Sequence, residues 1–161
     1  MPTGPRVLLK NVCYHIITRG NQKQQLFFDD EDYGKYLSTL RRYKKRCDFL
    51  LYGYCLMPNH IHLLGEPKEP KDLSRFMQGV CRSYTASFNK RYKKVGHLWQ
   101  GRFISKAIAK DDYFIDCIHY IERNPMRASL VKSASDYPWS SCKERTLAAN
   151  ARGRLLDDMR L

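Results

Sequence analysis

The sequence predicts an α+β fold in which strands and helices follow the order βαββαβ, with one more helix after the last strand. Three observations support this. Apolar residues alternate in short segments, they recur at helical spacing in longer ones, and glycine, proline or asparagine separates several of these segments. The βαββαβ order is that of ferredoxin-like folds, whose strands form one antiparallel sheet with two helices on one face. The other face is then available for a site.

The first strand and the first helix come early in the chain. Residues 12–19 alternate as a strand and end at Arg19-Gly20-Asn21, where glycine and asparagine indicate a turn. The acidic residues 29–32 suit the N-terminus of a helix. Tyrosine and leucine then recur at helical spacing until the basic residues 41–46, so we expect the helix to end there.

A hairpin and a long helix are predicted next. Residues 49–56 and 60–65 are expected to form strands on either side of Met57-Pro58-Asn59, a turn that makes them an antiparallel pair. Apolar residues between positions 73 and 88 mark a long amphipathic helix whose other faces carry arginine and lysine. Those basic faces suit a phosphate backbone, although solvated helix charge is the commoner explanation.

The last strand and the last helix precede a tail without a clear pattern. Residues 103–108 are expected to form the fourth strand, and Lys110-Asp111-Asp112 introduces the final helix. The chain then becomes irregular, and its end shows no core pattern. We therefore expect a single domain spanning 1–161, with a core of about 12–142 and a C-terminal tail of 143–161.

The composition indicates a nucleic-acid partner and a reducing environment. Lys+Arg 29 against Asp+Glu 16 gives a net charge of +13 in 161 residues, an excess that favours a polyanion through counterion release. The six cysteines form no C-x-x-C pair and fall at positions expected inside strands and helices. No apolar stretch is long enough to span a membrane, and the first residues lack a secretory signal core. We expect a cytoplasmic protein without a membrane partner.

Two histidines and a tyrosine form the candidate catalytic site. His60 and His62 stand two residues apart on a predicted strand, so both imidazoles point from one face as a pair of metal ligands. In the last helix, Tyr120 and Asn124 lie four residues apart on the flank of the apolar stripe, where a hydroxyl and a carbonyl reach one spot. We predict Tyr120 as the nucleophile and His60, His62 and Asn124 as metal ligands.

Each of these residues also has a plainer explanation. Alternating histidines can simply line a wet sheet face, and Tyr120 can be an ordinary half-buried tyrosine. Asn124 precedes Pro125 and resembles the N-cap of a short following helix. From the sequence, a metal-ligand role and an N-cap role are equally possible for Asn124.

The chemistry that these residues support is phosphodiester cleavage through a covalent tyrosine. A phenol with a pKa of about 10 is a poor nucleophile at neutral pH, so it needs a base or a cation that favours phenolate and withdraws charge from the phosphate. Two imidazoles, one carbonyl oxygen and open water positions suit Mn²⁺, and Mg²⁺ is tolerated. Attack by Tyr120 would leave a phosphotyrosine on one DNA end and a free hydroxyl on the other. The conserved bond energy would allow rejoining.

Aromatic and basic residues are interleaved in segments that suit single-stranded DNA. They include residues 92–94 and 97–103, and Tyr52 and Tyr54 in the predicted sheet. Unpaired bases stack on aromatic rings for roughly 1–3 kcal/mol each, whereas duplex DNA hides those faces. Trp99 is also suited to a core contact. The residues predicted to bind DNA are Arg19, Asn21, Arg82, Trp99 and Arg102.

With these residues in place, the chain resembles the IS200-like transposases with a single catalytic tyrosine, the Y1 group of HUH enzymes that includes the REP-associated tyrosine transposases. The resemblance runs from about Tyr14 to Ser141. Its motifs are His60-Ile61-His62, Arg19-Gly20-Asn21, Trp99-Gln100-Gly101-Arg102-Phe103, Tyr120-Ile121, Asn124-Pro125, Arg127-Ala128 and Pro138-Trp139-Ser140-Ser141.

The resemblance implies a ferredoxin-like fold and metal-dependent cleavage and rejoining of single-stranded DNA beside a hairpin, through 5′-phosphotyrosine. His60 and His62 match the family's metal ligands, and Tyr120 matches its nucleophile. Asn124 stands where insertion-sequence members commonly place glutamine, and asparagine followed by proline resembles the REP-associated branch. Family members use the tyrosine helix of their own subunit or that of a partner, so a homodimer stays open.

Two other functions compete with this one. An RNA-recognition module shares the βαββαβ order, but no ribonucleoprotein signature is present and histidines occupy the strand where stacking rings are expected. A metal-dependent hydrolase would use His60 and His62 to activate water. Replacing Tyr120 by phenylalanine separates the hydrolase from the tyrosine enzyme.

Overall fold

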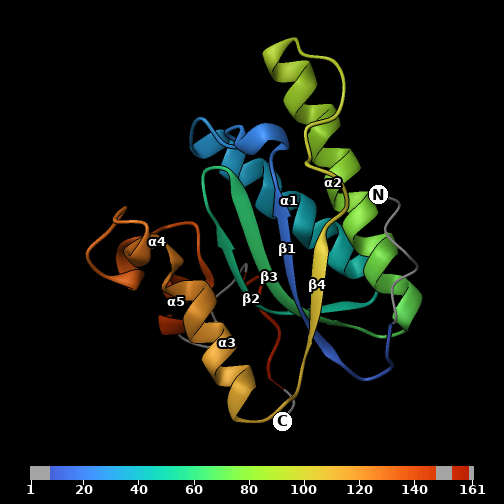
Figure 1. Cartoon of the computed structure of the whole chain (residues 1–161), viewed down its shortest axis with the longest axis vertical. Coiled ribbons are helices and arrows are strands. Elements are labelled where there is room, and N and C mark those ends of the chain that lie inside the picture. Colours follow the sequence, from blue (N-terminus) through green and yellow to red (C-terminus); the bar gives the residue numbers. More distant parts are fainter. Residues whose placement is uncertain (1–7, 148–153, 160–161) are drawn as a thin grey trace.

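The expected ferredoxin-like arrangement is confirmed in a computed structural model, which describes residues 8–147 and 154–159. The strands are β1 (Cys13–Arg19), β2 (Phe49–Leu56), β3 (His60–Pro67) and β4 (Ile104–Ile108). They form one antiparallel sheet in the order β2-β3-β1-β4 (Figure 1). The strand that carries the histidine pair, β3, therefore lies inside the sheet with β1 as its neighbour.

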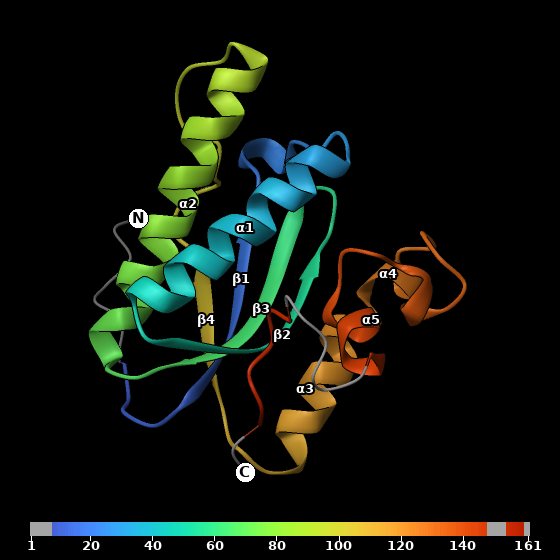
Figure 2. The same cartoon turned by 180° about the vertical axis from the view of Figure 1, so that it is seen from behind.

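The helices divide between the two faces of the sheet. They are α1 (Asp30–Arg46), α2 (Pro70–Tyr92), α3 (Asp112–Glu122), α4 (Asn124–Arg127) and α5 (Ser141–Thr146), with short 3₁₀ turns at Asn21–Lys23 and Ala134–Asp136. α1 and α2 cover one face (Figure 2), and α3 packs on the opposite face against β2 and β3. The face expected to be open is therefore covered over β2 and β3, whereas β4 keeps exposed side chains.

Side-chain caps explain where α1 and α3 begin. Asp29 accepts a hydrogen bond from the backbone nitrogen of Asp32 at 3.1 Å. Asp111 accepts one from the backbone nitrogen of Tyr113 at 3.0 Å. Both helices start at the acidic runs because these carboxylates satisfy free N–H groups and oppose the helix dipole.

Two apolar clusters hold the helices onto the sheet. One lies between the sheet and α1 and α2 and includes the stacked rings of Phe49 and Phe76. The other lies between the sheet and α3 and includes Tyr52 and Phe114. Tyr52 and Tyr54 are 1% and 5% exposed. The expectation that these two rings stack on DNA bases is wrong, because β2 is covered on both faces and its tyrosines are core residues.

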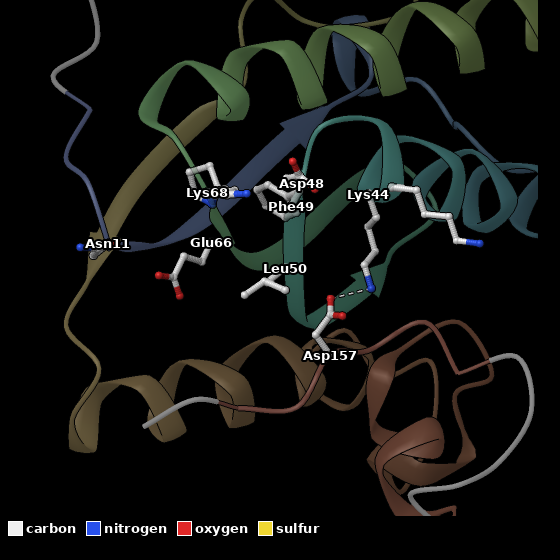
Figure 3. A pocket seen from close by; sticks show the side chains of 10 residues that line it. Asn11, Lys44, Asp48, Phe49, Leu50, Glu66, Lys68 and Asp157 are labelled. Carbon is white, nitrogen blue, oxygen red and sulfur yellow. Dashed lines mark ion pairs between the residues drawn. The ribbon is translucent and has the colours of Figure 1, made fainter.

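The C-terminal tail contributes to the core, contrary to the sequence expectation. Leu155 and Leu156 are buried in the cluster beneath α1. Asp157 accepts a hydrogen bond from the backbone nitrogen of Leu51 at 2.8 Å and pairs with Lys44 at 2.6 Å (Figure 3). It lines a cavity of about 550 Å³ at the end of β3 remote from the histidines. Two adjacent leucines in a charged segment carry no periodicity, which is why the sequence did not indicate this contact.

The cysteines are free thiols, and Cys13, Cys47 and Cys55 are buried. All six lie within the described part of the chain and are free thiols, as expected. Burial raises the pKa of Cys55 to about 12, so this thiol stays protonated and unreactive. In the same described residues, no helix combines the length and the apolar character needed to cross a bilayer.

Candidate active site

The register of the sheet brings three histidines together. His60 and His62 point from the same face of β3, with ring centroids 5.1 Å apart. Ile17 of β1 lies directly opposite His62 of β3. His15, two residues before Ile17, is therefore the diagonal neighbour of His62 on the same face of the sheet. The Nε2 atom of His15 and the Nδ1 atom of His62 are 2.9 Å apart, a hydrogen-bonding distance. His15 thus joins the expected pair, although no motif in the sequence singled it out.

α3 carries Tyr120 to the same face. Its apolar stripe, with Phe114 and Ile121, packs on the sheet. The ring centroid of Tyr120 lies 6.0 Å from that of His15 and 6.2 Å from that of His62, with both pairs edge-on. Tyr120 is 46% exposed, so a ligand can reach it from solvent. One chain therefore brings together the predicted nucleophile and the predicted histidine ligands.

His60 and His62 both use Nδ1 for a hydrogen bond. Nδ1 of His60 lies 2.7 Å from Oδ1 of Asn59, and Nδ1 of His62 faces His15. Among the described residues, no hydrogen bond occupies Nε2 of either of these two histidines. When one ring nitrogen of a histidine is hydrogen-bonded, the other is the atom available to a metal.

Burial keeps these imidazoles neutral. Desolvation, with added repulsion from the neighbouring histidines, lowers the pKa of His62 to about 3. Desolvation also lowers the pKa of His15 to about 4, and together with the charge of Arg19 it lowers the pKa of His60. Neutral imidazole is the form that binds metals, so the pair needs no deprotonation at neutral pH.

Asn124 stabilises the end of α3, the helix that carries Tyr120. Its Nδ2 atom donates to the backbone carbonyls of Tyr120 and Ile121, both at 3.2 Å. Arg123, not Asn124, occupies the N-cap position of α4. The Asn124 amide is thus fixed within one turn of Tyr120, and its carbonyl oxygen retains the capacity to bind a cation.

The predicted donors are of types that suit a divalent cation with several water ligands. Two imidazole nitrogens and an amide oxygen suit Mn²⁺ and are compatible with Mg²⁺. In residues 8–147 and 154–159, no group of three His, Cys, Asp or Glu side chains is arranged as a metal site. A cation at the histidine pair would therefore depend on an amide oxygen, on water or on substrate oxygens.

Arg127 covers the ring of Tyr120. Its guanidinium carbon lies 4.0 Å from the ring centroid, and its Nη2 atom donates to the backbone oxygen of Tyr120 at 3.2 Å. The positive charge of Arg127 is also one of the causes of the low pKa of His62. In the sequence, Arg127 stands out only as part of a motif, because its contact with Tyr120 depends on how α4 follows α3.

A buried ionic network fixes the end of α3. Glu122, 5% exposed, accepts hydrogen bonds from Ser141 Oγ at 2.7 Å and from Arg145 Nε and Nη2 at 3.0 and 2.9 Å. Arg145 Nη2 also donates to the backbone oxygen of Tyr52 at 2.7 Å. The network joins α3, α5 and β2, and its member on α3, Glu122, lies two residues after Tyr120. Glu122 and Arg145 were not predicted from the sequence, because they are 23 residues apart and share no motif.

Arg19 and Asn21 lie at the edge of this site. Arg19 ends β1, is exposed and stands opposite His60 in the strand register. Asn21 begins the following turn, and its Nδ2 atom lies 3.5 Å from Nε2 of His97. The exposed charge and the adjacent amide suit the DNA contacts expected of them.

The other expected DNA contacts lie in different surroundings. The indole nitrogen of Trp99 donates to the backbone oxygen of Cys81 at 3.1 Å, and its ring packs on the first apolar cluster. These contacts favour the core role that the sequence left open for Trp99. Arg102 is exposed just before β4. Arg82 lies on α2 in a groove with Arg46 and Arg75, on the opposite face of the sheet from Tyr120.

Two proteins with known sequences are similar to this chain over most of its length. A REP-associated tyrosine transposase of Haemophilus influenzae (strain ATCC 51907 / DSM 11121 / KW20 / Rd) is 29% identical over 122 residues, which cover 66% of this chain and 68% of that protein. A REP-associated tyrosine transposase of Escherichia coli (strain K12) is 24% identical over 122 residues, covering 75% of this chain and 70% of that protein.

Solved structures share the fold. A REP-associated tyrosine transposase bound to a REP hairpin superposes with a TM-score of 0.77 at 20% identity, covering 100% of this chain and 99% of that one. A Deinococcus radiodurans protein described as a transposase gives a TM-score of 0.51 at 22% identity, covering 76% and 97%. The family described as "Transposase IS200 like" matches residues 9–124, well over half of the chain. The protein therefore belongs to the IS200-like transposase family.

Proposed function

We propose that this protein cleaves and rejoins single-stranded DNA beside a hairpin, with the phenol oxygen of Tyr120 as the nucleophile. The observation that carries the proposal is the contact of the exposed Tyr120 ring with His15 and His62, at 6.0 and 6.2 Å between centroids. An accessible phenol beside His62, one of the two histidines proposed to bind the cation, suits attack on a phosphodiester assisted by that cation. The relative that was solved with a REP hairpin supports a hairpin as the DNA partner.

The proposed reaction is a displacement at phosphorus. The Tyr120 oxygen attacks the scissile phosphate while its proton passes to solvent, and the P–O3′ bond breaks. The leaving 3′ oxygen takes up a proton and becomes a hydroxyl, and the 5′ end stays on the tyrosine as a phosphotyrosine. Attack by a 3′-hydroxyl on this phosphotyrosine reverses the step and joins strands, because one phosphodiester is exchanged for another.

The proposed metal ligands are Nε2 of His60, Nε2 of His62 and the amide oxygen of Asn124. A bound Mg²⁺ or Mn²⁺ would withdraw charge from the scissile phosphate and favour the phenolate. Arg127, with its guanidinium 4.0 Å from the Tyr120 ring centroid, adds a fixed positive charge over the ring that carries the attacking oxygen. That charge would favour the phenolate form of Tyr120.

We propose that Tyr120 attacks DNA held by its own subunit. The apolar stripe of α3 packs on the sheet of the same chain, and the Glu122–Arg145 ion pair at 2.9 Å anchors its end. Within one chain, α3 already places the Tyr120 ring 6.0 Å from His15 and 6.2 Å from His62. A homodimer is therefore not needed to complete the site.

We propose Arg19 and Asn21 as the DNA contacts beside the site and Arg82 and Arg102 as contacts outside it. The net charge of +13 supports phosphate binding over a wide surface. Trp99, whose indole N–H is bonded to Cys81, would support the turn that carries Arg102 rather than stack on a base. The free cysteines suit the reducing cytoplasm as the place of action.

The test uses labelled single-stranded DNA from the flanks of this protein's own gene, with hairpin sequences included, in Mn²⁺ or Mg²⁺. A protein–DNA adduct that resists denaturant should form with the unmodified protein and be lost in Tyr120→Phe. Tyr113→Phe is the matched control, because Tyr113 is also an exposed tyrosine of α3, at 70% exposure, but has no ring contact with the histidines. His60→Ala with His62→Ala should abolish cleavage and preserve DNA binding.

Other outcomes would identify the competing functions. Cleavage that survives Tyr120→Phe would assign the attack to water and make the protein a metal-dependent hydrolase. Metal-independent RNA binding with no cleavage of any DNA hairpin would support an RNA-binding module. An adduct that survives Tyr120→Phe but is lost in Tyr113→Phe would show that Tyr113, and not Tyr120, is the nucleophile.

A further inference from the structure

His15 is a buried polar residue that the proposed reaction does not use directly. It is 7% exposed and lies on β1, next to the strand that carries the proposed ligands. Its ring stacks on that of His62, with centroids 5.2 Å apart and an interplanar angle of 27°. Its Nε2 atom meets Nδ1 of His62 at 2.9 Å. A buried imidazole of this kind acts through its hydrogen bond, because solvent hardly reaches it.

The neighbouring ligand shows the same arrangement. Nδ1 of His60 lies 2.7 Å from the amide oxygen of Asn59, and an amide oxygen can only accept. His60 therefore carries its proton on Nδ1, which leaves Nε2 with a free electron pair. Nδ1 of His62 is also hydrogen-bonded, but its partner is the Nε2 nitrogen of His15 instead of an oxygen atom.

A neutral imidazole can either donate or accept at a given ring nitrogen, so the His15–His62 hydrogen bond has two forms. If His62 donates from Nδ1, its Nε2 is unprotonated and can bind a cation. If His15 donates from Nε2, His62 carries its proton on Nε2, and that atom cannot bind a cation without losing it. Only in the first form is Nε2 unprotonated on both His60 and His62.

We propose that His15 is a positioning residue that accepts a hydrogen bond from Nδ1 of His62 and thereby keeps Nε2 of His62 unprotonated for metal binding. His15 must then carry its own proton on Nδ1. The inference rests on the proposed metal site, but it requires neither DNA nor the attack by Tyr120. His15 acts through His62 and does not itself bind the metal, because its Nε2 atom is occupied by the hydrogen bond.

The first experiment reads the tautomer directly in the metal-free protein. Long-range ¹H–¹⁵N correlation spectra of the histidine rings at neutral pH should show the proton of His62 on Nδ1. In His15→Leu, which fills the buried space with an apolar side chain, His62 should shift toward the Nε2-protonated form. His62 protonated on Nε2 in the unmodified protein would overturn the proposal, and this result needs no variant.

The second experiment measures Mn²⁺ affinity by electron paramagnetic resonance in the absence of DNA. His15→Leu should weaken binding by roughly 10–100-fold, the usual effect of losing a hydrogen-bond partner of a ligand histidine. His15→Gln should bind within about threefold of the unmodified protein, because the glutamine carbonyl can accept from Nδ1. His119→Leu is the control for loss of an exposed histidine and should leave affinity unchanged.

Several outcomes would overturn the role of His15. Unchanged Mn²⁺ affinity in a folded His15→Leu would do so, and so would equal losses in His15→Gln and His15→Leu. A loss in His15→Leu as complete as that in His62→Ala would make His15 a ligand instead. Failure of the proposed function is distinguishable from failure of this inference. A protein that cleaves no DNA but shows the predicted tautomer and Mn²⁺ affinities would refute the proposed DNA cleavage and still support the role of His15.

Discussion

Arg145→Met should destabilise the protein and misplace Tyr120, the proposed nucleophile. The substitution keeps a long apolar stem but removes the cation that pairs with buried Glu122 at 2.9 Å. Breaking a buried ion pair from one side costs roughly 3–5 kcal/mol, because a charge is left without its partner. The side chain of Arg145 is 25% exposed, and Ser141 still donates to Glu122 at 2.7 Å. We therefore expect about 3 kcal/mol, at the low end of that range.

The same substitution should slow cleavage. Glu122 stands two residues after Tyr120 on α3, and the lost hydrogen bonds connect that helix end with α5 and with the backbone of Tyr52 in β2. A shift of about 1 Å at a reacting atom can cost about 10²-fold in rate. We expect a loss of that size in single-turnover adduct formation, with little change in DNA affinity, because neither residue lies among the proposed DNA contacts.

Urea unfolding followed by circular dichroism measures the stability effect. Lys143→Met is the matched control, since Lys143 is an exposed residue of the same short helix. Combining Glu122→Gln with Arg145→Met removes the unpaired charge and should recover at least about 1 kcal/mol relative to Arg145→Met alone. The reasoning is refuted if Arg145→Met unfolds within about 0.5 kcal/mol of the unmodified protein, the range of ordinary surface substitutions.

Three further predictions concern the core, the tail and the DNA-binding surface. Gly65→Ala should cost about 1–3 kcal/mol in thermal unfolding, because an added methyl group would overlap the ring of Phe49, and equal stability would show that the strands can separate there. Leu155→Ala should lower the free energy of unfolding by about 2–5 kcal/mol, and no loss would show that the tail is dispensable. Arg46→Glu with Arg82→Glu should weaken hairpin binding and reduce its salt dependence, measured by fluorescence anisotropy at several salt concentrations, and an unchanged salt slope would exclude that groove as a phosphate contact.

The elements of the fold were predictable because their signals are local. β2 matches the expected 49–56 range, and the predicted helix end at 41–46 agrees with α1. Alternation marks strands, helical spacing marks helices, and acidic caps mark helix starts, all within a few residues. The same local rules predicted that His60 and His62 share a face of one strand and that Tyr120 stands outside the apolar stripe of its helix. Those positions lie together in the structure.

Burial from both sides of the sheet was not predictable in the same way. Tyr52 and Tyr54 alternate with smaller residues, and sequence spacing does not say that α3 covers one side of β2 while α1 covers the other. Leu155 and Leu156 lie in a charged segment, and only their contact with a distant strand and helix makes them core residues. Tertiary contacts decide such positions because local preference is weak there.

His15 shows where a sequence argument about the site ends. It is 47 residues from His62, and on β1 it occupies an inward position that an apolar side chain could fill equally well. Its importance depends on two facts that no local pattern contains: β1 pairs with β3, and the register makes His15 the diagonal neighbour of His62. The residues proposed to perform the chemistry carry motifs because their neighbours in sequence are also their neighbours in space. A residue that orients one of them needs only the right hydrogen-bonding atom at the right register, so it leaves no motif and is found only once the sheet is assembled.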